Sequence, residues 1–398
     1  MRARELRRYF NARYTPAQYA RFLALVEERS GTPPAFRHSE TPCFFEESFL
    51  ERLAADGAEL IHFLTEDKRY RQVSELAIPP QYRVPNEPPR PMFVQVDFGV
   101  VVGESGSLEP RLVEIQGFPS LYAYQPVLAR AYIDAYELPR DLGYLLEGFD
   151  DIAYWDLLRR AIVADCDPEN VILLEIDPAR QKTVCDFNVT QRRLGIRAVC
   201  ITKLKKEGAR LYYQRDGRSV PVHRIYNRAI VDELERKQIV LPFDWRDDMD
   251  VTWAGHPNFY FRISKFSIPW LRHPCVPRTI FLNEVEEIPA DLDRWVLKPL
   301  YSFAGLGVSI GPSRDEIERI PADERAKWIL QERVDFTPVI ETPHGPTKAE
   351  IRVMYVWLDR LNAVNTIIRM GRGKMMGVDY NKNMEWVGAS ASLYPEVE

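Results

Sequence analysis

The sequence lacks the features that define several protein classes. Its 398 residues include only five cysteines, which are odd in number and scattered, with no Cys-x-x-Cys pair. We therefore expect reduced, mostly buried thiols in place of a disulfide framework or a zinc site. No segment approaches the roughly 20 apolar residues of a membrane span, and the arginine-rich N-terminus has no apolar core of a signal peptide. These absences predict a cytoplasmic protein that does not contact a membrane.

An excess of positive charge is missing as well. The chain carries 53 basic and 58 acidic residues, a formal charge of −5, so it has no overall field to attract a phosphate backbone, and nucleic acid is not an expected partner. What is present is ordinary for a folded protein, with 45% hydrophobic and 28% charged residues. A chain of this length usually forms more than one core. We expect two or three subdomains around a shared cleft, and nothing in the sequence sets an oligomeric state.

Hydrophobic patterning and turn residues predict an α/β (α+β) protein with an N-terminal helical region. Thr15 and Gln18 form a capping box, with Pro16 in the first turn of a helix. Six prolines between positions 78 and 91 predict an extended linker. A strand, helix and strand pattern over 171–202 predicts a βαβ unit with parallel strands. The predicted divisions are a helical region with linker (1–91), a strand pair (92–130), an α/β region (131–255) and a strand-rich region with glycine loops (256–398).

A predicted hairpin carries the first candidate site. Its strands are 92–102 and 111–116, separated by a loop that contains glycine and serine. Strand alternation places Asp97 on one face of the first strand and Glu114 with Gln116 on one face of the second. If the strands pair, these three side chains converge and offer the oxygen ligands that Mg²⁺ prefers beside phosphate. The alternative for an isolated hairpin is a solvated sheet face.

The segment 295–308 carries the second candidate site. A predicted strand ends in Lys298, a loop of small residues follows with Gly305 and Gly307, and a strand returns. Glycines allow the backbone to approach a phosphate closely, and lysine supplies a compact positive charge. A phosphate-binding loop and a plain hairpin loop are both compatible with this pattern.

Together with Lys265 and the sequence Gln331-Glu-Arg-Val334, these two signals resemble the ATP-grasp superfamily. The acidic strands precede the glycine loop here, whereas the usual order of that superfamily is the reverse. This order is similar to the circularly permuted branch and, within it, to glutathionylspermidine synthase and its relatives. The resemblance covers about 92–125 and 256–394. It implies a circularly permuted ATP-grasp fold with a Rossmann-like pre-ATP-grasp domain over 131–255 as the substrate domain, and a nucleotide-binding domain over 256–398.

The resemblance also implies roles for individual residues, with ATP and Mg²⁺ as cofactors. The implied metal ligands are Asp97, Glu114 and Gln116. The implied nucleotide contacts are Lys265, Lys298, Ser302, Gly305, Gly307, Gln331, Glu332 and Val334. Arg352 and Arg369 are the implied catalytic residues, facing the transferred phosphoryl group and an acyl-phosphate.

The function that the resemblance implies is an ATP-dependent carbon–nitrogen ligase that forms ADP. Such an enzyme joins a small-molecule or peptide carboxylate to an amine through an acyl-phosphate. Positioned charges stabilise phosphoryl transfer, so no nucleophilic side chain is needed. The family usually has asparagine where this chain has Gln116. This change leaves open whether the chain has a second metal site. The alternative is an inactive ATP- or peptide-binding module of the same fold.

Three other patterns carry competing interpretations. The string Gly307-Val-Ser-Ile-Gly311 matches the nucleophile elbow of serine hydrolases, but its neighbours predict a strand where the elbow needs a strand-to-helix turn. The glycines between 371 and 377 predict a mobile loop that covers substrate. Arg224 and Arg228 flank the end of a predicted strand and are expected either in a substrate cleft or in a structural ion pair.

The histidines at 256, 273 and 344 are too dispersed along the chain to predict a zinc site.

Overall fold

The N-terminal region is helical, as predicted. The computed structural model describes residues 2–302, 305–381 and 383–395. The helices of this region are α1 (Ala3–Arg13), α2 (Pro16–Ser30), α3 (Glu47–Glu66) and α4 (Lys68–Ser74). The Thr15 side chain accepts a hydrogen bond from the backbone N–H of Gln18, so the predicted capping box is confirmed. A short strand that was not predicted, β1 (Cys43–Phe44), runs parallel to β19 (Ser392–Pro395) and joins the two ends of the chain.

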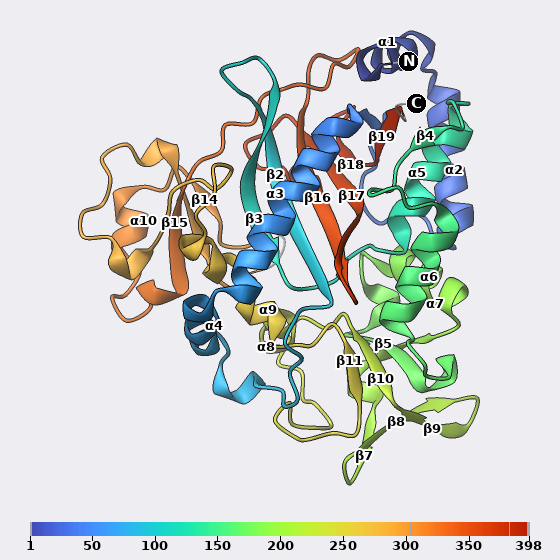
Figure 1. Cartoon of the computed structure of the whole chain (residues 1–398), viewed down its shortest axis with the longest axis vertical. Coiled ribbons are helices and arrows are strands. Elements are labelled where there is room, and N and C mark those ends of the chain that lie inside the picture. The colour runs from blue at the N-terminus through green and yellow to red at the C-terminus, as the bar shows by residue number, and fades with distance from the viewer. Residues whose placement is uncertain (1, 303–304, 382, 396–398) are drawn as a thin grey trace.

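The largest sheet lies at the centre of the molecule (Figure 1). Its five strands follow the order β18-β17-β16-β2-β3 and all pairs are antiparallel. Their bounds are β2 (Phe93–Val102), β3 (Leu108–Gln116), β16 (Lys348–Trp357), β17 (Leu361–Gly371) and β18 (Gly388–Ser390). The predicted hairpin of β2 and β3 is confirmed, although β3 begins earlier than the predicted strand.

The two faces of this sheet have different surroundings. Helix α3 crosses one face (Figure 1), where Val94, Val96 and Ile351 are fully buried. Side chains alternate between the two faces along each strand, and on the opposite face their character differs between the two ends of the sheet. Toward one end Phe93 and its apolar neighbours pack in the core that contains the helices α5 (Tyr124–Ala135) and α6 (Asp151–Ile162). Toward the other end the same face carries acidic and basic side chains.

A second, parallel sheet follows the order β11-β10-β5-β6. Its strands are β5 (Val171–Glu175), β6 (Arg197–Cys200), β10 (Arg224–Asn227) and β11 (Thr252–Ala254). Helix α7 (Val184–Leu194) connects β5 to β6 and ends at Gly195 in a left-handed conformation, which confirms the predicted βαβ unit. The short helix α8 (Val231–Arg236) follows β10.

A third sheet, β7-β8-β9, was not predicted. Its strands are β7 (Lys205–Glu207), β8 (Arg210–Arg215) and β9 (Arg218–Val222). They are short, and β8 and β9 each contribute only two alternating buried residues, Leu211 with Tyr213 and Val220 with Val222, so the signal for a strand is weak.

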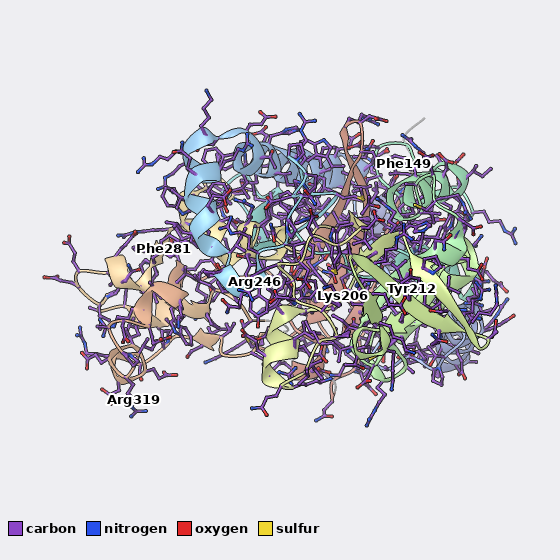
Figure 2. The ribbon with its side chains drawn as sticks, turned by 90° about the horizontal axis from the view of Figure 1, so that it is seen from below. Phe149, Lys206, Tyr212, Arg246, Phe281 and Arg319 are labelled. Atoms are coloured by element: carbon purple, nitrogen blue, oxygen red, sulfur yellow. The ribbon has the colours of Figure 1, made fainter. Side chains whose placement is uncertain are left out.

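The remaining large sheet builds a lobe on the left of Figure 1. Its order is β12-β15-β13-β14, formed by β12 (Thr279–Phe281), β13 (Trp295–Pro299), β14 (Ser309–Ile310) and β15 (Trp328–Glu332). Helix α10 (Arg314–Glu318) packs on it through Ile317, while α9 (Phe259–Arg262) precedes it in the chain. Figure 2 shows Phe281 and Arg319 in this lobe, with Tyr212 of β8 toward the opposite side of the molecule.

A three-stranded sheet, β1-β19-β4, closes the fold near the termini and includes the short strand β4 (Leu142–Gly143). Within the described ranges, no helix is long and apolar enough to cross a membrane.

Candidate functional site

One cavity brings the predicted site residues together. It has a volume of about 540 Å³ and lies between the charged end of the central sheet and the β12–β15 lobe. Of the residues predicted from the sequence it is lined by Asp97, Glu114, Gln116, Lys265, Lys298, Ser302, Gly305, Gln331, Glu332, Val334, Arg352 and Arg369. Gly307 lies in the same loop but does not line the cavity. The predicted proximity is therefore confirmed for positions that are up to 272 residues apart.

The floor of the cavity is a row of charges across four adjacent strands. Asp97 of β2 lies opposite Glu114 of β3 on one side and Arg352 of β16 on the other. Glu350 of β16 lies opposite Arg369 of β17. The Nη2 atom of Arg352 donates to Asp97 Oδ2 over 2.7 Å, Arg369 also donates to this carboxylate, and Arg369 Nε lies 2.8 Å from Glu350 Oε1. Cross-strand register thus fixes which charges meet.

Two lysines from outside the central sheet complete this row. Lys265 begins a 3₁₀ turn, and its Nζ lies 2.9 Å from Glu114 Oε1 and donates to the backbone carbonyl of Ser302 over 2.9 Å. Lys298 is the fourth residue of β13, and its Nζ donates to Gln331 Oε1 over 2.5 Å and to the Val113 carbonyl over 3.0 Å. Both ammonium groups are buried, so their charge is held in place before a ligand arrives.

Burial and neighbouring charge act against each other on the carboxyl groups. Burial raises the pKa of Asp97, but the charges of Arg352 and Arg369 outweigh it, and the pKa lies below its ordinary value. Burial also raises the pKa of Glu114, and Lys265 reverses that shift. Glu350 differs, because burial raises its pKa more than Arg369 lowers it. Asp97 and Glu114 are therefore held as carboxylates at neutral pH.

The protonated form of Lys298 is destabilised by its surroundings. Burial lowers its pKa to about 8, with the charge of Lys265 acting in the same direction, and Glu114, Glu350 and Asp97 only partly oppose the shift. A bound anion would favour the protonated form. This lysine is therefore sensitive to what occupies the cavity.

The segment after β15 forms one wall of the cavity. The side chains of Val334 and Phe336 pack so closely on Gly99 of β2 that a β-carbon there would lie 2.8 Å from Phe336 and 2.9 Å from Val334. The glycine thereby lets the wall approach the sheet. Gln331 is 2% exposed and its Nε2 has no hydrogen-bond partner among the described residues, so a buried donor remains available to a ligand.

The glycine loop lies at the mouth of the cavity. Gly305 and Gly307 have φ angles of +76° and +73°, which glycine adopts without the steric cost of a side chain. The Oγ of Ser302, another buried polar atom of this loop, also lacks a partner in the part of the chain that the structure describes. Phe303 and Ala304 of the predicted motif lie outside the described residues.

The segment 372–380 covers the cavity opposite the glycine loop, where sequence predicted a covering loop. Asn381, which is 1% exposed, holds it in shape by accepting from the backbone N–H of Arg372 over 3.1 Å and donating to the Met375 carbonyl over 2.8 Å. A β-carbon on Gly305 would lie 3.0 Å from Met375 Cε, so the two loops touch. The mobility predicted for this segment stays a prediction.

Two lining residues from distant regions were not predicted. Phe36 comes from the N-terminal helical region and Lys182 from the segment before α7, and both reach the cavity. Lys182 Nζ pairs with Asp379 Oδ2 over 2.6 Å. Neither residue lies in a motif, so no local signal marks it.

The donor chemistry fits a magnesium ion only in part. Asp97 and Glu114 supply hard oxygen donors on one surface, as Mg²⁺ requires. Their oxygens are at present bound by the arginines and by Lys265, which would have to turn toward phosphate. Gln116 fits less well, because its amide oxygen faces Arg352 Nη1 and Nη2 at 2.7 and 3.0 Å when the amide is oriented to satisfy its neighbours.

The structure decides two of the competing interpretations. Ser309 lies in strand β14 and hydrogen bonds to Glu316 over 3.1 Å, which does not match the strand-to-helix turn of a nucleophile elbow. Arg228 pairs with Asp186 over 2.6 Å in the buried interior, and Arg224 donates to the carbonyls of Ala161 and Ile162. Both arginines are therefore structural in this state.

A larger cavity, of about 650 Å³, contains none of the predicted site residues. It follows the proline-rich linker beside α4 and α9. Its central cation, Arg262, is neutralised by Glu75 and Glu87 at 2.5 and 2.6 Å. We therefore assign the functional site to the smaller cavity, where charged groups face the open space.

The fold belongs to a known structural class. No protein-family model matches the sequence, and no curated protein matches it significantly. Among solved structures, the chain has a fold similar to that of glutathione synthetase-like proteins. One matching structure is the apo form of a glutathione synthetase-like effector from Globodera pallida, with 10% sequence identity, a TM-score of 0.60 and coverage of 100% of this chain and 98% of that one. At this identity the similarity establishes the fold alone.

Proposed function

We propose that this protein is an ATP-dependent carboxylate–amine ligase of the circularly permuted ATP-grasp type, similar to glutathionylspermidine synthase. The observation that carries the proposal is the charged cavity, in which Lys265 and Lys298 lie beside the central-sheet residues Arg352, Arg369, Asp97, Glu114 and Glu350. Four cations against three acids leave a positive surplus that suits a polyphosphate. The order of the strands, with β2 and β3 preceding the glycine loop yet joining β16 and β17, supports the permuted arrangement.

The parts of the cavity suit different parts of ATP. The apolar wall of Val334 and Phe336, with the free donor of Gln331, suits an adenine ring. Lys298 and Lys265 lie between that wall and the central sheet, where they would hold phosphates. Magnesium bound with the nucleotide would neutralise the β- and γ-phosphates, and the residues suited to hold it are Asp97 and Glu114.

The chain's own residues would then position charge around phosphoryl transfer. Arg352 and Arg369 are both tied to Asp97 in this state, so release of that carboxylate frees two guanidinium groups beside the reacting phosphoryl group. A substrate carboxylate would enter below the covering segment 372–380, whose closure would exclude water from an acyl-phosphate. An amine would complete the reaction by attacking that intermediate and expelling phosphate.

Trapping with hydroxylamine tests the proposal. The full-length protein is incubated with ATP, Mg²⁺, hydroxylamine and a panel of carboxylates that includes γ-glutamyl peptides, and hydroxamate and ADP are quantified. We expect ATP-dependent hydroxamate with the matching acid, and none from Lys298→Met. The Lys327→Met variant changes an exposed lysine of the same lobe, 64% exposed at its side chain, and should behave as the parent. ATP binding without any hydroxamate across the panel would refute the ligase.

One observation favours the second candidate, a module that binds ATP or a peptide without turnover. Gln116 is bound by Arg352, and Asp97 is shared by two arginines, so the acidic strands are already neutralised from within the protein. If this arrangement persists when ATP binds, magnesium has no free carboxylate on β2. Nucleotide affinity that is the same with Mg²⁺ and with a chelator would support the module.

A further inference from the structure

A second group of ligand-forming side chains lies outside the cavity. Asp56 belongs to α3, while His273 and Cys275 lie on the loop between the 3₁₀ turn at Lys265 and strand β12. One ligand atom from each of these residues lies within 4.8 Å of the others. His273 meets Asp56, which lies more than 200 positions away in the chain, so no sequence spacing indicates this group.

The histidine ring turns Nδ1 toward Cys275 and Nε2 toward Glu59. The backbone N–H of Cys275 donates to His273 Nδ1 over 3.2 Å, which makes Nδ1 the unprotonated nitrogen, and the Cys275 Sγ atom lies 3.0 Å from the same Nδ1. The other nitrogen, Nε2, faces Glu59 Oε2 at 3.3 Å. A carboxylate that holds the second nitrogen of a histidine is the usual support of a metal-bound imidazole.

We propose that Asp56, His273 and Cys275 bind a zinc-class transition-metal ion, with Glu59 orienting the histidine. One thiolate, one carboxylate and one neutral imidazole balance the charge of a divalent ion. The thiolate selects against Mg²⁺ and Ca²⁺, and three protein ligands leave one position of a tetrahedral site for a water molecule. This site is separate from the proposed ATP site and does not depend on it.

A reactive cysteine is the main alternative, since a thiol beside an imidazole can act as a nucleophile. The surroundings oppose it. Cys275 is 3% exposed, which leaves no room for an attacked substrate.

The ion would connect helix α3 to strand β3, which lines the cavity. The Cys275 carbonyl accepts from Leu112 N–H over 2.7 Å, and Arg111 Nη1 donates to the Pro274 carbonyl over 2.6 Å. Leu112 lies two positions before Glu114 on β3. A metal at this site thus braces α3 against the strand that carries a charged wall of the cavity.

Binding of cobalt tests the site, because a cobalt–thiolate bond gives a charge-transfer absorption band. The full-length protein is stripped with a chelator, its fold is checked by circular dichroism, and Co²⁺ is added. We expect the band to saturate at about one equivalent, to disappear when Zn²⁺ is added, and to be absent in Cys275→Ser. In Glu59→Gln the band should persist with affinity reduced about ten- to a hundredfold.

Matched controls are Cys200→Ser and His62→Gln, which change a half-buried cysteine elsewhere and the exposed histidine of α3 that pairs with Glu66. Both should bind Co²⁺ as the parent does. The proposal is overturned if the parent protein shows no saturable thiolate band, or if the band survives in Cys275→Ser. Should Cys275→Ser fail to fold, the parent titration and the surface variant Glu59→Gln, whose side chain is 70% exposed, still decide the question.

Discussion

Two buried ion-pair systems in this molecule have opposite designs. In the parallel-sheet region Asp186 has one ionic partner, Arg228, and its Oδ1 also accepts from the backbone N–H groups of Ala123 and Tyr124 at 2.9 and 3.0 Å. Every oxygen of this carboxylate is satisfied by its own protein. This arrangement ties α5, α7 and the end of β10 together, although the Nε of Arg228 has no hydrogen-bond partner among the described residues.

The cavity contains the open counterpart. Asp97 is shared by Arg352 and Arg369, and Arg369 is shared in turn with Glu350. Beside them, the Nε2 of Gln331 and the Oγ of Ser302 have no partner among the described residues. Charges that exchange partners, next to unused donors, can reorganise around an incoming anion. Both systems are buried, so burial does not distinguish a structural ion pair from a candidate binding site. Shared partners, and unpaired donors that line a cavity, do distinguish them.

The largest effect on stability is expected at the pair of Asp186 and Arg228. Asp186→Asn keeps the shape and the oxygen that caps Ala123 and Tyr124 but leaves Arg228 as an uncompensated buried charge, so the free energy of unfolding should fall by about 3–5 kcal/mol. Urea denaturation followed by circular dichroism measures it. The matched variant Asp97→Asn should lose clearly less, because Glu350 still neutralises Arg369. Equal losses in the free energy of unfolding would contradict the distinction between the two systems.

Arg369 should matter for turnover more than for nucleotide affinity. In Arg369→Ala the charge beside the reacting phosphoryl group is lost, and kcat should fall by about 10²–10³-fold, comparable to the loss of one donor in an oxyanion-type site. ATP affinity, measured by calorimetry, should change far less. Arg360→Ala, in the turn of the same hairpin, removes an exposed arginine that pairs with Glu147 and serves as the control. A variant that loses affinity and keeps kcat contradicts this role.

The lysines should determine nucleotide affinity. Lys298→Met and Lys265→Met each remove a charge while retaining most of the side-chain volume, so ATP binding should weaken by about 1.5–3 kcal/mol without unfolding. Calorimetric titration gives the affinity, and a melting curve shows that the fold persists. If both variants bind ATP as the parent does, the nucleotide does not occupy this cavity.

The smallest expected effect is a change in bound protons. The pKa of Lys298 is lowered to about 8 by burial, so above pH 8 the free protein holds this lysine largely neutral. A polyphosphate restores its charge, and ATP binding should therefore take up a fraction of a proton at pH 8.5–9. Calorimetry in two buffers of different ionisation enthalpy measures this uptake. Lys298→Arg, which stays charged, should abolish it.

The same pKa has a consequence for stability with a defined sign. The folded pKa of Lys298 lies below its ordinary value of 10.5, so between about pH 8 and pH 10.5 the unfolded chain binds more protons at this position than the folded one. Stability contributed by this group therefore rises with pH across that window, and the Lys298→Met variant should lose this slope. A slope that persists in the variant would assign it to other groups.

Much of the fold could be predicted because the relevant signals are local. The capping box of α2, the glycine that ends α7 and the alternation in β2 and β3 are all set by neighbours in sequence. The β7–β8–β9 sheet was missed because its strands are short, and β8 and β9 each contribute only two alternating buried residues.

The composition of the cavity was predictable from its motifs, but the pairing of its charges was not. Alternation placed Asp97 and Glu114 on one face, yet the register that sets Arg352 opposite Asp97 joins strands far apart in the chain. Phe36, Lys182 and the group of Asp56, His273 and Cys275 were missed for the same reason. Their proximity is created by tertiary packing, and no sequence period records it.

The pairing of β2 with β16 also governs how the protein can be made. Asp97 and Arg352 are 255 positions apart in the chain, and at a synthesis rate of about 5–20 residues per second the partner strand emerges roughly 13–50 seconds after β2. During that interval β2 is an edge strand, and unpaired edges favour aggregation. Helix α3 is already complete by then and can cover the apolar face of the β2–β3 hairpin. The nascent chain can thus bury that face before its partner strand β16 emerges.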